Sequence, residues 1–309
     1  MKPILSIIIP AYNAGEFLAR AVDSVFAKGY NLDVEVIIVN DGSKDNTASV
    51  AERLCEVFQN VKLITQENQG VSAARNRGIE ESAGEYVYFM DADDAVKPIF
   101  LETVLPLFSS GETDLLAFGF THYKKGGVIH QRELNFRGKS LLEDYLKGKI
   151  RLGIWSIITK RSIIIDNNIR FDEQTYYSED LEFMVKLLVN SSEIKTLRKP
   201  LYDYLMLSDE SAMNKKGYSV KTFTTITAWV RIYDYLVKCN VSREVSKAAL
   251  NRLIYYYFSQ KNIYNKTKQY AHLDTLFKEY SYISKKTPPI QLSKFWVYNI
   301  LKFVKTNYL

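Results

Sequence analysis

The sequence predicts an α/β protein in which helices cover a mostly parallel, Rossmann-like sheet, followed by a C-terminal helical region. Strand and helix patterns alternate over roughly the first 120 residues, which is typical of strands joined by crossover helices. The composition, with 47% hydrophobic and 25% charged residues, is that of a globular protein. Beyond Ser219 the pattern is helical to the end of the chain.

The alternation begins with a buried strand and an amphipathic helix. Residues 5–10 form an almost continuous apolar run, as expected of a parallel strand covered on both faces. Apolar residues then recur at helical spacing over residues 17–26, and Gly29 ends the helix. Asn13 and Glu16 are expected to form a capping box at its start.

Three further strand-helix units follow. The expected strands are residues 34–39, 61–65 and 86–90. The helices after them begin near Asp45, after Gly70 and at Pro98. After Asp114 the pattern changes: residues 115–123 predict a strand, residues 124–127 the turn of a hairpin, and mixed signals continue to about Tyr204.

Composition divides the chain near Lys215. We expect residues 1–215 to form the ligand-binding and catalytic domain and residues 216–309 to form a helical region, broken near Asn240, Asn265 and Pro288. Residues 215–309 carry about 17 Lys or Arg against about 4 Asp or Glu, so this stretch is near +13 and the remainder near −7. Such a region either contacts an anionic surface or is a solvated basic annex.

Two features indicate the cellular compartment. The two cysteines, Cys55 and Cys239, are far apart and form no disulfide framework, which fits a reducing cytoplasm. The apolar N-terminal run is too short to span a bilayer, and no other run approaches the roughly 20 apolar residues of a membrane helix. We therefore expect a cytoplasmic protein, with peripheral attachment to the inner face of the plasma membrane as the alternative.

Acidic residues follow two of the predicted strands. Asp41 ends the second strand, and Asp91 and Asp93 follow the fourth. Parallel sheets bind ligands beyond the carboxyl ends of their strands. Carboxylates repel phosphates but bind Mg²⁺ or Mn²⁺, which in turn binds diphosphate oxygens, and they accept hydrogen bonds from ribose or base. An acidic cleft therefore indicates a nucleotide diphosphate held through a metal.

Several classes of protein are disfavoured by absent motifs. The sequence contains no G-x-x-x-x-G-K-[ST] and no G-x-G-x-x-G after the first strand, which argues against P-loop nucleotidases and dinucleotide binding. A nucleotidyltransferase would carry a Gly-rich basic loop after the first strand, which residues 10–15 lack. No nucleic-acid-binding motif accompanies the basic C-terminal region, so we expect no nucleic-acid partner.

Four short motifs in order resemble family 2 glycosyltransferases of the GT-A fold, of the type that builds bacterial surface polysaccharides. They are IIIPAYN at residues 7–13, VNDGS at 39–43, NQGVSAARN at 68–76 and DADD at 91–94. The resemblance covers roughly residues 3–215. It implies a metal-dependent, inverting transferase that moves a sugar from a UDP-sugar to a hydroxyl of a saccharide or lipid-linked saccharide.

The resemblance also implies roles for residues of the donor site. Tyr12 would stack on the base, and Asp41 would accept from its N–H. Arg75 would lie near the base or the diphosphate, while Asp91 and Asp93 would hold ribose and the Mn²⁺ or Mg²⁺ ion. The remaining donor-site residues on this basis are Pro10, Ala11, Ala73 and Ala92. Asp94 is expected instead to cap the helix that follows.

Residues of the acceptor site are implied in the same way. In YSEDLEF at residues 177–183, Asp180 would be the general base and Glu179 an acceptor contact; the alternative is an acidic first turn stabilised by the helix dipole. Trp155 would contact the acceptor or belong to the core. The His or Arg that the family often carries after the strand matching residues 201–205 is absent, so Lys215 or Lys216 takes that role or the contact is missing.

Two questions stay open at this level. Residues 292–309 place apolar residues near one face of a helix and lysines on another, which suits a membrane surface, a second subunit or the protein's own domain equally. The alternative to a transferase is a catalytically inactive carbohydrate-binding or scaffolding protein. Retention of all four acids, Asp41, Asp91, Asp93 and Asp180, favours the enzyme.

Overall fold

A computed structural model describes residues 2–29, 32–124, 127–206 and 224–267, the last seven by their backbone only. The chain divides into two compact units, Met1–Tyr218 and Ser219–Leu309.

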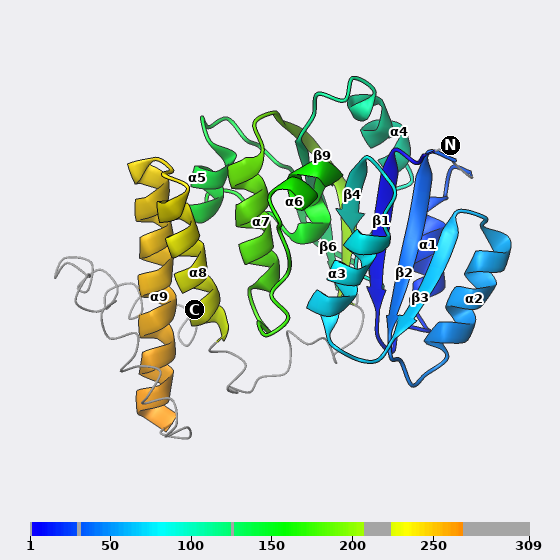
Figure 1. The fold of residues 1–309 in the computed structure, drawn as a ribbon, viewed down its shortest axis with the longest axis horizontal. Coiled ribbons are helices and arrows are strands. Elements are labelled where there is room, and N and C mark those ends of the chain that lie inside the picture. The colour runs from blue at the N-terminus through cyan, green and yellow to red at the C-terminus, as the bar shows by residue number, and fades with distance from the viewer. Residues whose placement is uncertain (1, 30–31, 125–126, 207–223, 268–309) are drawn as a thin grey trace. The chain divides into compact units, whose positions relative to one another are not determined.

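Nine strands of the described residues form one sheet in the first unit (Figure 1). They are β1 (Leu5–Ala11), β2 (Val34–Asp41), β3 (Val61–Gln66), β4 (Tyr86–Phe89), β5 (Ala95–Val96), β6 (Leu115–Lys124), β7 (Gly127–Arg132), β8 (Ile157–Lys160) and β9 (Ile194–Met206). Their order is β3-β2-β1-β4-β8-β6-β9-β5, with β7 paired to β6.

The sheet has a parallel half and a mixed half. β3, β2, β1 and β4 run parallel, and Ile8 of β1 pairs with both Ile37 and Phe89. β8 is antiparallel to β4 and to β6, whereas β9 is parallel to β6 and antiparallel to β5. The predicted α/β class and the hairpin of β6 and β7 are confirmed. Because β1, β2 and β4 are parallel, their carboxyl ends meet at one edge.

Helices cover both faces of the parallel half. The helices of the first unit are α1 (Leu18–Val25), α2 (Thr47–Val57), α3 (Val71–Glu81), α4 (Phe100–Val104), α5 (Leu141–Leu146), α6 (Arg161–Asp166) and α7 (Glu179–Asn190), with 3-10 turns at Leu105–Phe108 and Ile154–Ser156. α1 and α2 pack on Ile7 and Ile38, whereas Ala74 of α3 packs on Ile37 and Val39 of the opposite face.

Close packing fixes the position of α3 on the sheet. A Cβ added to Gly78 would lie 2.3 Å from Ile8 Cγ2 in β1. Only a residue without a side chain lets the helix lie this close to the strand. Arg75 is carried one turn earlier on the same helix.

The capping box predicted from Asn13 and Glu16 is wrong. α1 begins at Leu18, and its N-cap residue Phe17 makes no side-chain capping bond. Asn13 instead adopts a positive φ of 49° and joins two loops. Its backbone N–H donates to Ser43 Oγ at 3.0 Å, and its Oδ1 accepts from Lys44 N at 2.9 Å. The amide side chain therefore ties the end of β1 to the end of β2.

The second unit contains α8 (Thr224–Lys238) and α9 (Arg243–Thr267), which pack together with Trp229 stacked on Tyr256. The break predicted near Asn240 is confirmed, since Asn240 has a φ of 54°. The structure describes α9 as far as Thr267, so the break predicted near Asn265 falls at the limit of the described residues and stays a prediction. The predictions for Lys215, Lys216, Pro288 and residues 292–309 lie outside the described residues. No helix of the described part is long and apolar enough to cross a membrane.

Candidate active site

A cleft of about 390 Å³ opens where β1, β2 and β4 end. Seven of the predicted donor-site residues line it: Pro10, Ala11, Tyr12, Asp41, Asp91, Ala92 and Asp93. Five residues that were not predicted complete the lining: Asn13, Ala14, Phe17, Val71 and Ala74. The other two predicted donor residues, Ala73 and Arg75, are buried in α3 and do not line the cleft.

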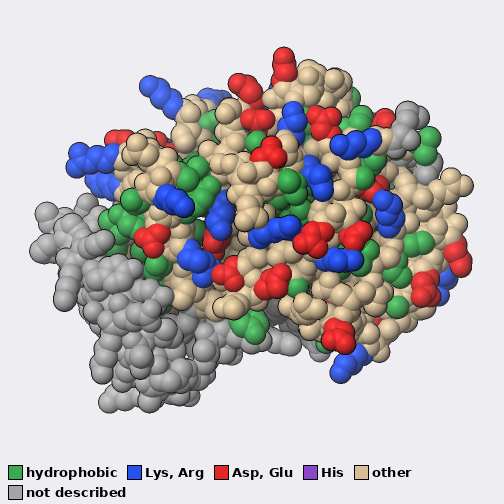
Figure 2. Space-filling model, viewed as in Figure 1, with side chains coloured by type: hydrophobic (Ala, Val, Ile, Leu, Met, Phe, Trp, Pro, Cys, Tyr) green, Lys and Arg blue, Asp and Glu red, His purple; other side chains and the backbone are tan. Residues whose placement is uncertain are grey.

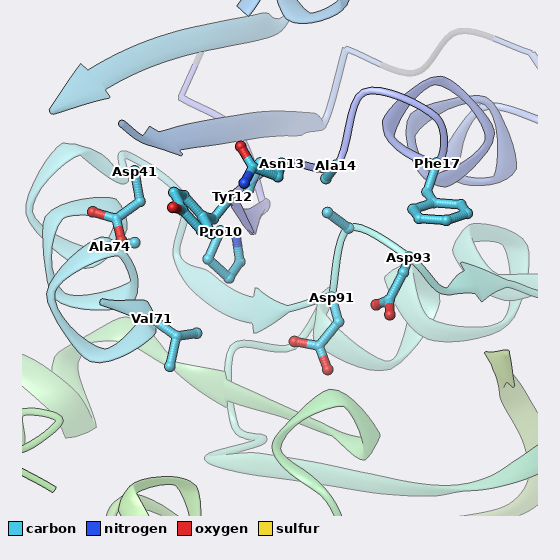
Figure 3. Close-up of a pocket in the computed structure, with 12 residues that line it drawn as sticks. Pro10, Tyr12, Asn13, Ala14, Phe17, Asp41, Val71, Ala74, Asp91 and Asp93 are labelled. Carbon is cyan, nitrogen blue, oxygen red and sulfur yellow. The ribbon is translucent and has the colours of Figure 1, made fainter. Parts of the chain in front are cut away.

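The strand order sets the arrangement of the cleft. β1 lies between β2 and β4, so Pro10 and Tyr12 stand between Asp41 on one side and Asp91 and Asp93 on the other (Figure 3). Tyr12 is 50% exposed although it is a large aromatic residue. An exposed ring in the middle of a cleft is available for stacking on a flat ligand group.

Asp41 is buried and holds the loop that leads into α3. Its Oδ1 accepts from Gln66 Nε2 at 2.8 Å and from the Gln69 N–H at 2.9 Å, and its Oδ2 accepts from the Gly70 N–H at 2.8 Å. A carboxylate has about four acceptor positions, so Oδ2 keeps one for a ligand donor. Asp41 thus orders the start of α3 and can still accept one hydrogen bond in the cleft.

The loop carrying Asp91 and Asp93 is attached to β9. Asp94 is buried and accepts from Tyr202 Oη at 2.6 Å and from Leu205 N at 2.7 Å. The prediction that Asp94 caps the next helix is therefore wrong, because α4 begins after Ile99, which makes no side-chain cap. Desolvation and the nearby Asp91 and Asp93 raise the pKa of Asp94 well above its ordinary value.

Asp93 presents its carboxylate at the mouth of the cleft, and its backbone carbonyl accepts from Arg20 Nη2 at 2.6 Å. Partial desolvation and the charge of Asp91 raise the pKa of Asp93. A cation bound beside these two carboxylates would stabilise the charged form of Asp93.

Arg75 connects the cleft to the start of α7. Its Nη2 lies 3.1 Å from Asp91 Oδ1 and its Nη1 lies 3.2 Å from Glu179 Oε1. The guanidinium is buried and stands 5.3 Å above the Phe171 ring. Although burial disfavours its charge, Asp91, Glu179 and Asp180 together raise the pKa of Arg75. The arginine therefore remains charged and binds Glu179, which is 104 positions away in the sequence.

Glu179 and Asp180 form the first turn of α7. Ser178 precedes them with a φ of 74°, a left-handed conformation that non-glycine residues adopt rarely and often near functional sites. Desolvation, together with Asp180, raises the pKa of Glu179 to about 7 against the opposing effect of Arg75. Burial raises the pKa of Asp180, and Arg75 opposes that rise.

The two carboxylates differ in what they bind. Glu179 is engaged by Arg75, whereas Asp180 Oδ1 accepts from the Leu181 N–H at 2.8 Å. No hydrogen bond from any residue that the structure describes reaches Asp180 Oδ2. One oxygen of Asp180 is thus available to accept a proton.

The oxygen atoms that the cleft offers suit a hard cation that is coordinated partly by the protein and partly by a bound ligand. Within the described part of the chain, no group of three or more His, Cys, Asp or Glu residues could enclose a metal ion. The carboxylates of Asp91 and Asp93 are therefore the candidate metal ligands of the cleft. Mg²⁺ and similar ions are commonly held by one or two carboxylates with the other positions filled by substrate phosphates and water.

Trp155 belongs to an aromatic cluster and is half-buried. Its ring stacks on Tyr202 at 4.7 Å and meets Phe120 edge-on at 4.6 Å. Tyr202 in turn donates to Asp94, so the cluster supports the loop that carries Asp91 and Asp93. Sequence reasoning missed Tyr202; the only signal was its position in a strand whose pairing partner could not be known.

The fold and the cleft define an α/β enzyme that binds a ligand beyond the carboxyl ends of parallel strands. Residues 6–167 match the model of the family described as "Glycosyl transferase family 2". The chain is also 31% identical over 247 residues to an uncharacterized glycosyltransferase of Escherichia coli, YibD, covering 76% of this chain and 71% of that protein. The protein belongs to glycosyl transferase family 2.

Solved structures confirm the GT-A type of fold. The structure of Staphylococcus aureus TarS in complex with UDP-GlcNAc matches with a TM-score of 0.71 at 20% identity, over 85% of this chain and 75% of that one. A mannosyltransferase of Pyrobaculum calidifontis in complex with GDP-Man and Mn²⁺ matches with a TM-score of 0.56 at 16% identity, over 100% of this chain and 88% of that one.

Proposed function

We propose that this glycosyltransferase transfers a sugar from a UDP-sugar to a hydroxyl group of a saccharide or lipid-linked saccharide, with inversion at the anomeric carbon. One observation carries the proposal. The cleft that contains Tyr12, Asp41, Asp91 and Asp93 is joined through Arg75 to the acidic start of α7. A donor site and a candidate general base are thus connected by a buried ion pair.

The nucleotide would occupy the side of the cleft near Tyr12 and Asp41. The exposed ring of Tyr12 offers a stacking surface, and the remaining acceptor position of Asp41 Oδ2 suits the N3–H of uracil. Cytosine has no N–H at that position, so this contact favours UDP over CDP. The fold neighbour TarS binds UDP-GlcNAc, which supports the same donor class.

Asp93, with Asp91, would hold Mn²⁺ or Mg²⁺ together with the diphosphate. Desolvation and the charge of Asp91 raise the pKa of Asp93, and a cation at this place would offset both effects. The mannosyltransferase neighbour was solved with Mn²⁺. Bound there, a divalent cation supplies stabilisation of the negative charge that develops on the leaving diphosphate.

Asp180 would act as the general base. The acceptor hydroxyl oxygen forms a bond to the anomeric carbon while the bond from that carbon to the diphosphate breaks, and UDP departs. The proton of the hydroxyl passes to Asp180 Oδ2, the oxygen that no described residue binds. A single in-line displacement inverts the anomeric configuration. Burial raises the pKa of Asp180, and the charge of Arg75 opposes that rise and favours the ionised form.

The acceptor side of the site is the start of α7 with Glu179, and the aromatic cluster around Trp155. Family 2 membership implies a saccharide acceptor, and a lipid-linked saccharide would bring the enzyme to a membrane surface. Cytoplasmic location, peripheral attachment through the C-terminal region, and oligomerisation are parts of the same proposal.

Calorimetric titration of UDP, GDP and CDP tests the donor site. Each nucleotide is titrated with Mn²⁺ or with EDTA into wild type, Asp93→Ala and the control Glu56→Ala. Glu56 is an exposed carboxylate on α2, away from the cleft lining. We expect UDP to bind most tightly, and both EDTA and Asp93→Ala to weaken binding by about tenfold or more, since a charged contact is lost.

The control variant should match wild type. If folded wild-type protein binds none of the nucleotides in the presence of metal, the transferase proposal fails and a carbohydrate-binding role replaces it. If UDP binds equally well with EDTA and in Asp93→Ala, the assignment of the metal to Asp93 is wrong.

A further inference from the structure

The chain between α6 and α7 is attached to α3 by the side chain of Asn76. Asn76 Oδ1 accepts from the Phe171 N–H at 3.0 Å, and Asn76 Nδ2 donates to the Phe171 carbonyl oxygen at 3.0 Å. The same amide nitrogen donates to Glu173 Oε1 at 3.0 Å. One buried side chain thus binds both main-chain groups of a single residue, as a neighbouring strand would.

The main chain at Phe171 depends on this amide. Phe171 is buried and belongs to no helix or strand. Its N–H and its carbonyl oxygen make no other hydrogen bond with a residue that the structure describes. Because buried main-chain groups without partners are costly, the amide of Asn76 determines where the chain can lie at Phe171.

The ring of Phe171 connects this attachment to α7 and to Arg75. It stacks on Phe183 of α7 with the ring centroids 3.9 Å apart, and it meets Phe89 of β4 edge-on at 5.3 Å. The guanidinium of Arg75 lies over the same ring, 5.3 Å from its centroid. A residue held by α3 therefore supports both the helix that carries Glu179 and the guanidinium that binds it.

The first turn of α7 is held at two points. Glu179 binds Arg75 at 3.2 Å, and Phe183, one turn further along the helix, packs on Phe171. Asp180 lies between these two contacts in the sequence of α7. Both contacts involve groups that rest on Phe171, so the position of Asp180 depends on where Phe171 lies.

Charges on the surface do not replace this attachment. On the face drawn in Figure 2, acidic and basic side chains are interspersed over the first unit. Arg170 and Glu80 join the same chain segment to α3 at 3.2 Å, but their side chains are 40% and 49% exposed. Exposed ion pairs are weakened by water and by salt. The buried amide of Asn76 is therefore the stronger of these two links.

We propose that Asn76 is a positioning residue of the transferase, whose amide fixes the place of Asp180 relative to the donor cleft. This inference rests on the proposed function and adds a residue to it. Asn76 does not line the cleft and takes no part in the chemical step; it acts through Phe171, which supports Arg75 and α7. A displacement of about 1 Å at a reacting group can lower a rate by about 10²-fold, so a small movement of α7 is sufficient.

Two variants of Asn76 test the proposal. Asn76→Asp keeps the shape of the side chain and the acceptor for the Phe171 N–H, but its second oxygen faces the Phe171 carbonyl oxygen and Glu173 Oε1, which repel it. Asn76→Ser removes the amide without adding a charge. The matched control is Asn60→Asp, because the amide of Asn60 donates to the Val34 carbonyl oxygen at 2.5 Å, at the end of β2 away from the cleft.

Three quantities are measured on each folded protein. They are the affinity for UDP with Mn²⁺, the amide hydrogen exchange of residues 171–183, and the rate of UDP release. The rate is measured with saturating UDP-glucose, UDP-galactose or UDP-GlcNAc, whichever wild type hydrolyses fastest, so that water takes the place of the acceptor. Thermal unfolding establishes that every variant is folded at the temperature of the assays.

We expect both Asn76 variants to release UDP about tenfold or more slowly than wild type, with faster exchange at residues 171–183. Their affinity for UDP should change by less than about twofold, because Asp41 holds the start of α3 through its own hydrogen bonds. Asn60→Asp should match wild type in all three quantities. A residue that merely stabilised the fold would not separate the rate from the affinity in this way.

Failure of this proposal can be distinguished from failure of the proposed function. Rates above half that of wild type in both Asn76 variants, or parallel losses of rate and UDP affinity, would overturn the role of Asn76 alone. Wild type that binds no UDP would refute the transferase. In that case the exchange measurement still decides whether Asn76 holds residues 171–183, and exchange equal to that of wild type would overturn this step as well.

Discussion

The two halves of the sheet build their parts of the site in different ways. In the parallel half, the acids and the exposed aromatic ring of the cleft stand within a few positions of a strand end: Tyr12 after β1, Asp41 at the end of β2, Asp91 after β4. In the mixed half, function depends on pairs that are distant in sequence. Arg75 and Glu179 are 104 residues apart, and Asp94 and Tyr202 are 108 apart.

The two halves of the sheet therefore contribute to the site in different ways. The parallel half forms the cleft mainly through local backbone geometry at its strand ends, and β9 additionally holds the loop of Asp91 and Asp93 through Asp94. The mixed half positions its acids through buried ion pairs and hydrogen bonds, which are strong only while every partner is present. Substitutions in the mixed half should therefore affect chemistry and stability, while nucleotide binding follows the parallel half.

The largest expected effect comes from Asp180→Asn. Asparagine keeps the size of the side chain and can still accept from Leu181 N, but it cannot take up a proton. We expect the transfer rate to fall by about 10²- to 10⁴-fold, while the affinity for UDP in Mn²⁺ changes by less than about twofold. Rate assays and calorimetry on the same preparation measure the two quantities.

Asp166→Asn serves as the matched control, since Asp166 is an exposed acid at the end of α6 in the same half. Its transfer rate should equal that of wild type. If Asp180→Asn retains more than about a tenth of the activity, the base is another group, and the separation of roles between the two halves is wrong in this respect.

Arg75→Met should have the next largest effect, because Arg75 is the ion-pair link between α3 and α7. Methionine fills a similar volume but leaves the carboxylates of Asp91 and Glu179 without their partner. Removing one member of a buried pair costs about 3–5 kcal/mol. We expect that loss in the free energy of unfolding by urea denaturation at neutral pH, and a smaller loss at pH 5, where Glu179 binds a proton.

Arg77→Met provides the comparison on the same helix. Arg77 is half-exposed and pairs with Glu81 at 2.7 Å on the surface. Surface pairs of this kind contribute about 0.3–0.5 kcal/mol. Equal losses for the two variants would show that Arg75 does not join the two halves in any energetically significant way.

The smallest effect is a change in the pH dependence of stability caused by Glu179→Gln. Desolvation, with Asp180, raises the pKa of Glu179 from 4.5 to about 7 in the folded protein. Between these values the folded state holds a proton that the unfolded state has lost. The contribution of Glu179 to stability is therefore fully present below about pH 4.5 and decreases as the pH rises to about 7.

Urea denaturation of wild type and Glu179→Gln at a series of pH values between 4.5 and 8 isolates this contribution. Stability of the variant should fall less steeply than that of wild type between pH 4.5 and 7, and the two slopes should agree above that range. Identical slopes throughout would mean that the ionisation of Glu179 is the same in the folded and unfolded states, and that the start of α7 is not desolvated.

Sequence reasoning succeeded where structure is local. The strands and helices of the parallel half are visible as periodicity, and Asp41 and Asp91 were found because acids at strand ends are conspicuous. It failed where one residue serves two segments. Asparagine is common at helix N-caps, yet the side chain of Asn13 accepts a hydrogen bond from Lys44 N beside β2. Asp94 is close to a helix start, yet β9 takes both of its oxygens.

The mixed half could be predicted only in outline for the same reason. β9 runs for 13 residues and pairs with both β6 and β5, and no pattern in residues 194–206 specifies those partners. The sequence predicts that Arg75 lies near the base or the diphosphate, but not that it forms ion pairs with Asp91 and Glu179. Which carboxylates surround an arginine depends on how α3 and α7 pack, and that is a property of the whole domain.

Close contact between Gly78 and Ile8 has a consequence for the evolution of this enzyme. Any side chain at position 78 would push α3 away from β1 and carry Arg75 with it, since the two residues are one turn apart. Selection on the reaction would therefore act on position 78 although glycine contributes no chemical group. Residues that touch a ligand could therefore vary between related enzymes while position 78 stays restricted, because a side chain there would displace the guanidinium that binds Asp91 and Glu179.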